Sequence, residues 1–148
     1  MKFKILSLVA LLAFVLPAFA LDPHDAQVSN VTTAASTTST SAAQAVTVAT
    51  LTTHAVNAGT NSYIIMAQVD FEAPSGGAVT LQLTNDGTAI AGTARLVSNQ
   101  GGVTLMAEVE NIAVSKAITI QAVIAPSGAT FKVNKASLVI NGQAGATQ

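Results

Sequence analysis

The chain has 148 residues, of which 50% are hydrophobic, 9% are charged and 4% are aromatic, and it contains no Cys and no Trp. This length fits one compact domain rather than two. Six basic residues against seven acidic ones leave no basic field of the kind that attracts nucleic acid or anionic lipid, so we expect no nucleic-acid partner.

The first twenty residues have the three parts of a secretory signal peptide. Lys2 and Lys4 make a positive start, residues 5–16 carry no charge, and Ala18-Phe19-Ala20 supplies the small residues that a signal peptidase needs. We therefore expect cleavage after residue 20, export, and a secreted or cell-surface protein that is not inserted into a membrane. Cleavage would leave 4 basic against 7 acidic residues, a net charge of −3.

Residues 21–44 are rich in Thr, Ser and Ala and offer little to fill a core. This composition favours a flexible leader or stalk. An alternative is that Val28, Val31 and the Thr-rich stretch form a strand that is donated to a neighbouring subunit, because extended peptides add to open sheet edges.

From residue 45 to about residue 141 the hydrophobic pattern has a period of two, which predicts one domain of β-strands. Val46 and Val48 alternate with Thr47 and Ala49 in the first strand. The strongest strand spans residues 63–71.

One face of the strand at 63–71 carries Tyr63, Ile65, Ala67, Val69 and Phe71. Its other face begins with Ile64 and Met66, so it is apolar on both sides at its start. One sheet layer covers only one such face, which makes Ile64 and Met66 candidates for an oligomer interface, together with Val28 and Val31.

The later strands follow the same alternation. Asp86-Gly87 predicts a type I′ hairpin turn, because both central residues of that turn need a positive φ angle. Seven to nine short strands in about one hundred residues predict an all-β, antiparallel two-sheet sandwich of jelly-roll type, with residues 142–148 as a flexible tail. The residues expected in one common core are Phe71, Leu81, Leu105, Ile120 and Val133.

Three stretches resemble a known jelly roll. They are NSYIIMA at 61–67, GGVTLMAEV at 101–109, and AITIQA at 117–122 followed by Phe131 and ASLVI at 136–140. Their order and spacing resemble the globular heads of complement-q proteins and tumour-necrosis-factor-like domains. The resemblance implies a trimer with an N-terminal stalk and a head that serves as a binding or structural module.

Catalytic chemistry has little support in this sequence. The two histidines, His24 and His54, lie far apart, and no Gly-x-Ser-x-Gly elbow is present to hold a nucleophile. Without Cys and with separated His, we expect no zinc site and no resident cofactor. We expect a protein that is not an enzyme.

Four carboxylates are the weak candidates for a metal site. Asp70 and Glu72 lie on the face of their strand opposite the core row, and Glu108 and Glu110 do so on theirs. Pairing of those strands would therefore offer four carboxylates as oxygen ligands to calcium. The alternative interpretation, which we favour, is that they are solubilising residues near strand ends, because no calcium-binding loop accompanies them.

These patterns predict a secreted structural protein that associates with itself, either as a stalked trimer or as the subunit of an extracellular filament or surface layer. The alternative is an extracellular module that binds protein or glycan through its loops. A single Tyr and no Trp leave little surface for sugar stacking.

Overall fold

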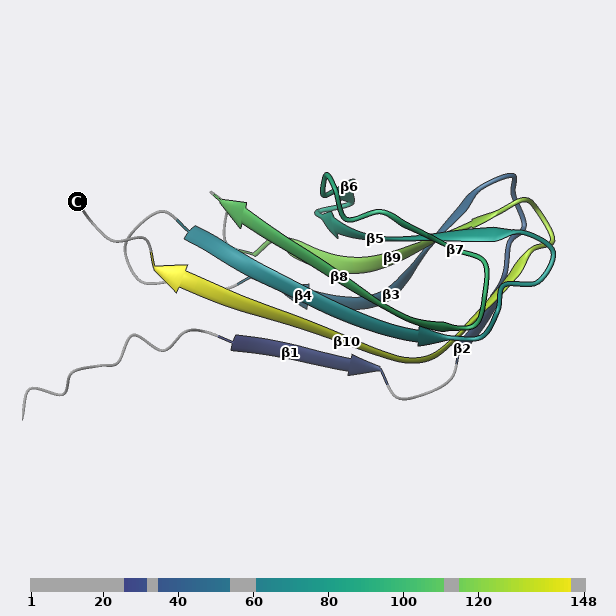
Figure 1. Ribbon diagram of the computed structural model, residues 1–148. Coiled ribbons are helices and arrows are strands. Elements are labelled where there is room, and N and C mark those ends of the chain that lie inside the picture. The colour runs from purple at the N-terminus through teal and green to yellow at the C-terminus, as the bar shows by residue number, and fades with distance from the viewer. Residues whose placement is uncertain (1–25, 32–34, 54–60, 111–114, 145–148) are drawn as a thin grey trace, which may run out of the picture.

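The structure is a computed structural model that describes residues 26–31, 35–53, 61–110 and 115–144. These residues form two antiparallel β-sheets that pack face to face (Figure 1). Among them there is no helix with the length and apolarity that crossing a membrane requires. The predicted all-β sandwich is confirmed.

Sheet A has the strand order β1-β10-β4-β8, and β2 pairs with β10 as well. Its strands are β1 (Ala26–Val31), β2 (Ala35–Thr38), β4 (Asn61–Phe71), β8 (Gly101–Glu110) and β10 (Thr130–Ala144). Sheet B has the order β3-β9-β5-β6, and β7 pairs with β5. Its strands are β3 (Gln44–Thr52), β5 (Ala78–Asn85), β6 (Thr88–Ala89), β7 (Arg95–Val97) and β9 (Ala117–Ala125).

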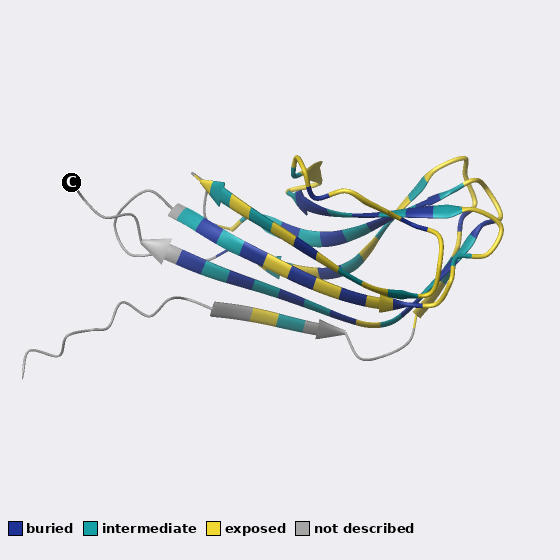
Figure 2. Cartoon of the chain, viewed as in Figure 1, coloured by how far each residue is buried: buried dark blue, intermediate teal, exposed yellow. Residues whose placement is uncertain are grey.

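The core lies between the sheets and is built from the inward-facing row of each strand. Buried and accessible residues alternate along the strands, as Figure 2 shows for β4 and β10. This is the pattern expected where only one face of a sheet packs on a core. All five residues predicted to share one core belong to this cluster: Phe71, Leu81, Leu105, Ile120 and Val133.

The predicted hairpin joins β5 to β6. Asn85 pairs with Thr88, and the two residues between them, Asp86 and Gly87, have φ angles of 50° and 82°. Two successive positive φ angles define the type I′ turn, so the turn type is confirmed.

Two β-bulges change which residues face the core. In β10 the register shifts between Val133 and Lys135, so Val133 is buried before the shift and Ala136 after it. One extra residue reverses the inward and outward alternation, which lets both halves of a 15-residue strand bury an apolar row. In β3 a similar shift between Thr47 and Ala49 brings Ala49 into the core, where strict alternation from Val46 had placed it on the other face.

Part of the segment predicted as a leader lies in sheet A. Within residues 21–44, both β1 and β2 pair with β10 of the same chain. Without them, one edge of β10 would present unpaired backbone groups, which explains why these two short segments pair there. Residues 21–25 and 32–34 lie outside the described residues, as do residues 145–148 of the predicted tail.

Candidate interaction surface on sheet A

An apolar row crosses the outer face of sheet A. Val28 of β1 pairs with Val139 of β10, Val139 pairs with Met66 of β4, and Met66 pairs with Met106 of β8. Directly opposite residues of antiparallel strands share a face. Since the neighbouring residues Leu105 and Leu138 are buried, this row points away from the core.

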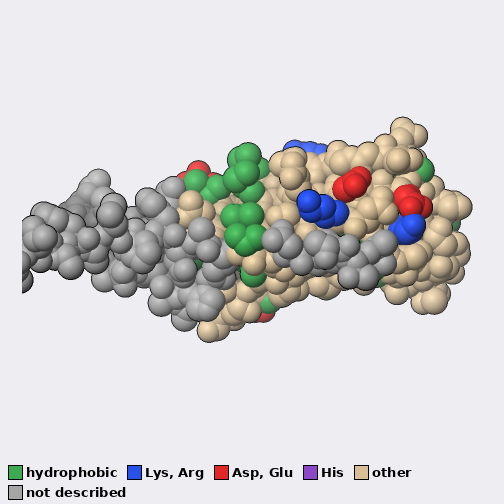
Figure 3. All heavy atoms as spheres, turned by 90° about the horizontal axis from the view of Figure 1, so that it is seen from below, with side chains coloured by type: hydrophobic (Ala, Val, Ile, Leu, Met, Phe, Trp, Pro, Cys, Tyr) green, Lys and Arg blue, Asp and Glu red, His purple; other side chains and the backbone are tan. Residues whose placement is uncertain are grey.

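The row is accessible to solvent. Val28 is 55% exposed, Met66 45% and Met106 61%, while Val139 is half-buried between its neighbours. Figure 3, which views the molecule from below, shows hydrophobic side chains gathered in a patch beside charged ones. We call Val28, Val139, Met66 and Met106 the apolar row.

Different residues border the apolar row on its two sides. On one side Ile64 is half-buried and lies opposite Asn141 and Glu108. On the other side Gln68 lies opposite Ser137 and Thr104, and all three are polar. The predicted interface residues Ile64, Met66 and Val28 thus share the outer face of sheet A.

The fourth predicted interface residue, Val31, pairs with Ala136 of β10, and its side chain lies outside the described part of the structure. Sequence reasoning did not include Val139 and Met106 among the interface residues. Their alignment with Met66 depends on the register of three strands that are distant in the sequence.

A shallow depression of about 480 Å³ adjoins the apolar row. Its polar lining comprises Gln68, Asp70, Gly102, Thr104, Lys135 and Ser137. Asp70 lies between Lys135 on β10 and Gly102 on β8, and the missing side chain at Gly102 helps to hollow the surface. The depression offers one carboxylate, one ammonium group and neutral hydrogen-bonding groups, which suits polar recognition rather than covalent chemistry.

The strands that carry the four carboxylates do pair, but their antiparallel register does not bring the carboxylates together. Asp70 lies opposite Gly102, whereas Glu108 lies opposite Ile64. Six residues of strand, roughly 20 Å, therefore separate the two ends. Among the described residues, no three His, Cys, Asp or Glu side chains form a group that could hold a metal ion.

The individual acidic residues have ordinary surroundings. Glu72 forms an ion pair with Lys132, and both side chains are about half exposed. Glu108 and Glu110 are exposed at the end of β8. Of the two ion pairs in the described residues, neither involves Asp70 or Lys135.

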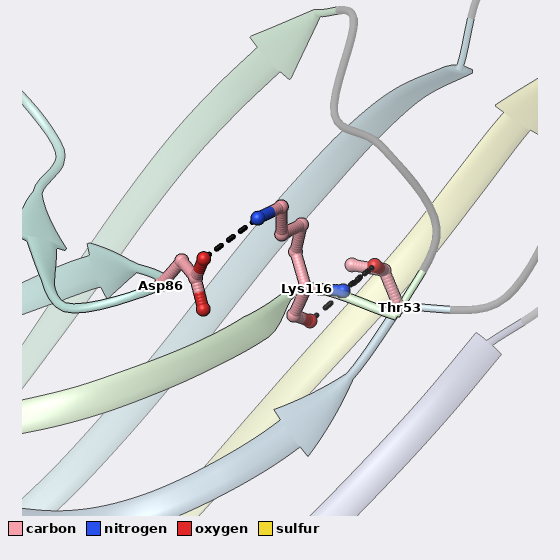
Figure 4. A network of polar contacts seen from close by, with 3 residues as sticks. All are labelled: Thr53, Asp86 and Lys116. Atoms are coloured by element: carbon pink, nitrogen blue, oxygen red, sulfur yellow. Dashed lines mark hydrogen bonds and ion pairs between the residues drawn. The ribbon is translucent and has the colours of Figure 1, made fainter.

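A polar network closes one end of sheet B (Figure 4). The Lys116 Nζ lies 2.7 Å from the Asp86 Oδ2, and the Lys116 backbone N–H donates to the Thr53 Oγ1 at 3.0 Å. The Thr53 backbone N–H in turn donates to the Lys116 carbonyl oxygen at 2.9 Å. The network joins the end of β3, the start of β9 and the β5–β6 turn, so it holds these three segments together.

Both histidines, His24 and His54, lie outside the described residues. The chain matches no protein family and no curated protein by sequence. The resemblance to complement-q and tumour-necrosis-factor-like heads, carried by residues 61–67, 101–109 and 117–140, therefore stays a prediction.

Proposed function

We propose that this protein is an exported, non-enzymatic β-sandwich of jelly-roll type that assembles with copies of itself. The observation that carries the proposal is the apolar row, because it joins exposed apolar residues on three strands through the half-buried Val139 on the fourth. Single exposed apolar residues are ordinary, but a continuous patch is typical of an interaction surface.

The strand order supports the jelly-roll part of this proposal. If β1 and β2 count as one edge strand, and β6 and β7 as another, the sandwich has four strands in each sheet. Eight strands in two sheets are the jelly-roll number. From β3 onward the chain also changes sheet at each step except within β5–β7, as in such folds.

A second copy of this chain is the partner that the surface fits best. The low charged fraction of 9% leaves little repulsion between copies. Beside the apolar row, Asp70 and Lys135 occupy directly opposite positions. A two-fold arrangement brings Asp70 of each copy to Lys135 of the other while the apolar rows cover one another, so the face is complementary to itself.

The experiment compares Met66→Lys with Leu96→Lys by size-exclusion chromatography with light scattering. Met66 lies in the apolar row, whereas Leu96 lies on β7 of sheet B and is 73% exposed. Met66→Lys is expected to reduce the assembly to smaller species, because it buries an unpaired ammonium group in the contact. Leu96→Lys is expected to assemble as the wild type does.

Two results would overturn the proposal. One is a wild-type protein that stays monomeric at high concentration, and the other is an equal effect of both substitutions. Export is tested separately, by mass spectrometry of protein recovered outside the cytoplasm, which is expected to begin at Leu21.

The alternative function is ligand binding in the extracellular space. It is favoured by the depression of about 480 Å³, where Asp70 and Lys135 have no ion pair among the described residues. This alternative takes the lead if the wild-type protein is a stable monomer.

A further inference from the structure

β8 is the last strand of sheet A on the side away from β10 (Figure 1). It pairs with β4 over its full length of ten residues, without a register shift. Within the described residues, no strand pairs with its other edge. The backbone N–H and C=O groups of every second residue of β8 point to that edge and thus lack a strand partner.

The other edges of the sandwich are interrupted or short. The opposite edge of sheet A is divided between β1, with six residues, and β2, with four. On sheet B, β6 has two residues, β7 has three, and β3 contains a bulge. β8 has no bulge, no Pro and no basic residue, and its only charges are Glu108 and Glu110 at one end. Native proteins use short strands, bulges, Pro and basic residues to prevent edge pairing. Their absence from β8 indicates an edge that is open to pairing with another strand.

We propose that two copies join by antiparallel pairing of β8 with β8, in the register that places Met106 opposite Met106 of the second copy. The inference rests on the proposed self-assembly and assigns one of its contacts. In this register Val103 lies opposite Val109 of the second copy, and Leu105 lies opposite its Ala107.

The inner row of β8 explains the choice of register. Val103, Ala107 and Val109 face the core but are only half-buried, because they lie at the open edge of the sandwich. The row is symmetric about Met106, so each of these side chains gains an apolar neighbour. A register centred on Leu105 instead sets Val109 opposite Gly101, which has no side chain to cover it.

The outer row of β8 fits the same register. Thr104 lies opposite Glu108 of the second copy, and Gly102 lies opposite its Glu110, so no two carboxylates face each other. Parallel pairing in register sets each Glu beside its equivalent, which is unfavourable. Contact between the two Met106 side chains also joins the two apolar rows into one band that crosses eight strands.

The two contacts have different consequences for assembly. A single isologous contact closes as a dimer. Two separate isologous contacts on one subunit, one at the β8 edge and one on the outer face of sheet A, close as a tetramer when their two-fold axes intersect at right angles and otherwise add further copies in an extended assembly. Neither arrangement is a closed trimer, which needs heterologous contacts.

Cysteine crosslinking of the purified exported protein tests the register, since the natural chain has no Cys. Directly opposite positions lie about 4.5–5.5 Å apart between Cα atoms, within the range that a disulfide spans. Met106→Cys is expected to form covalent dimers under mild oxidation. Thr104→Cys alone and Glu108→Cys alone are expected not to, because each lies roughly 13 Å from its own equivalent.

A mixture of Thr104→Cys and Glu108→Cys proteins supplies the second measurement. These residues lie opposite each other in the proposed register, so crosslinks are expected only between the two variants. All three positions are exposed, so the substitutions leave the core unchanged. Self-crosslinking of Thr104→Cys would overturn the inference, because it indicates parallel pairing or another register.

Charge at position 104 gives a test in solution. Thr104→Lys adds two attractive pairs with Glu108 across the contact, and Thr104→Glu adds two repulsive ones. The dissociation constant of the edge contact is expected to fall and to rise, respectively, by about two- to thirty-fold. Equal effects of both substitutions would overturn the proposed contact.

Failure of this inference is distinguishable from failure of the proposed function. If light scattering shows assembly of the wild type but Met106→Cys does not crosslink, the β8 contact is wrong and self-assembly stands. If the wild type is monomeric at high concentration, both are wrong.

Discussion

The outward position of Met106 follows from the orientation of β8, and a pair of neighbouring substitutions tests that orientation directly. Leu105 and Met106 are consecutive residues on one strand, but Leu105 is 1% exposed and Met106 is 61% exposed. Leu105→Ala removes the equivalent of three methylene groups from the core. Met106→Ala removes a side chain that is largely in water.

The expected loss of stability follows from these exposures. Burial of each methylene contributes about 0.8 kcal/mol, so the three groups account for about 2.4 kcal/mol. The cavity that remains adds to this, and the cost of Leu→Ala at buried sites reaches about 5 kcal/mol. We therefore expect Leu105→Ala to lower the free energy of unfolding by about 2.5–5 kcal/mol. Met106→Ala is expected to change it by no more than about 0.5 kcal/mol.

Urea denaturation measures both variants. The single Tyr of the chain, Tyr63, is 1% exposed, so its fluorescence reports the loss of the core without interference from Trp. With a denaturant slope of about 1–3 kcal/mol per molar urea, a loss of 3 kcal/mol lowers the midpoint by about 1–3 M. The protein concentration is kept where light scattering shows single subunits, because association adds to apparent stability.

The reverse result would refute the reasoning. If Leu105→Ala costs less than about 0.5 kcal/mol and Met106→Ala costs more than about 2 kcal/mol, β8 is shifted by one residue and its two faces are exchanged. Met106 would then lie in the core. Neither the apolar row nor the proposed β8 contact would then exist, because both need Met106 on the outer face.

Two further predictions concern the close approach at Gly77 and the network around Thr53. A Cβ at Gly77 would lie 2.1 Å from the Ala125 carbonyl oxygen. Gly77→Ala is therefore expected to lower the free energy of unfolding by about 1–3 kcal/mol or more, as measured by thermal denaturation. Gly101→Ala, whose Cβ meets no atom within 4 Å, is the control and is expected to be nearly neutral; equal melting temperatures for the two variants would contradict the packing at Gly77. Thr53→Val removes the acceptor of the Lys116 backbone N–H and is expected to lower the free energy of unfolding by about 1–3 kcal/mol. Lys116→Met removes only an ion pair between half-exposed side chains and is expected to lower it by no more than about 1 kcal/mol. A larger loss in Lys116→Met, measured by the same denaturation, would place the stability of the network in its ion pair.

The local patterns of the sequence determined the strand content and much of the core. The inward row of β4, Tyr63 to Phe71, and the turn at Asp86-Gly87 were predicted correctly. Both depend on neighbouring residues only. Alternation with a period of two decides which side chains share a face, and a positive φ angle at two successive residues decides the turn.

The tertiary structure decided what depends on pairs of residues that are distant in the chain. Strand order placed β1 and β2 beside β10, and two bulges reversed the alternation near Val48 and Asn134. The antiparallel register of β4 and β8 separated Asp70 from Glu108 and aligned Met66 with Met106. Alternation fixes the face of a side chain but carries no information about which residue lies opposite, because shifting a strand by two residues leaves its faces unchanged. The candidate surface consists of such opposite pairs. Two of its members, Val28 and Met66, were therefore predicted from the sequence, whereas Val139, Met106 and the alignment across four strands were not.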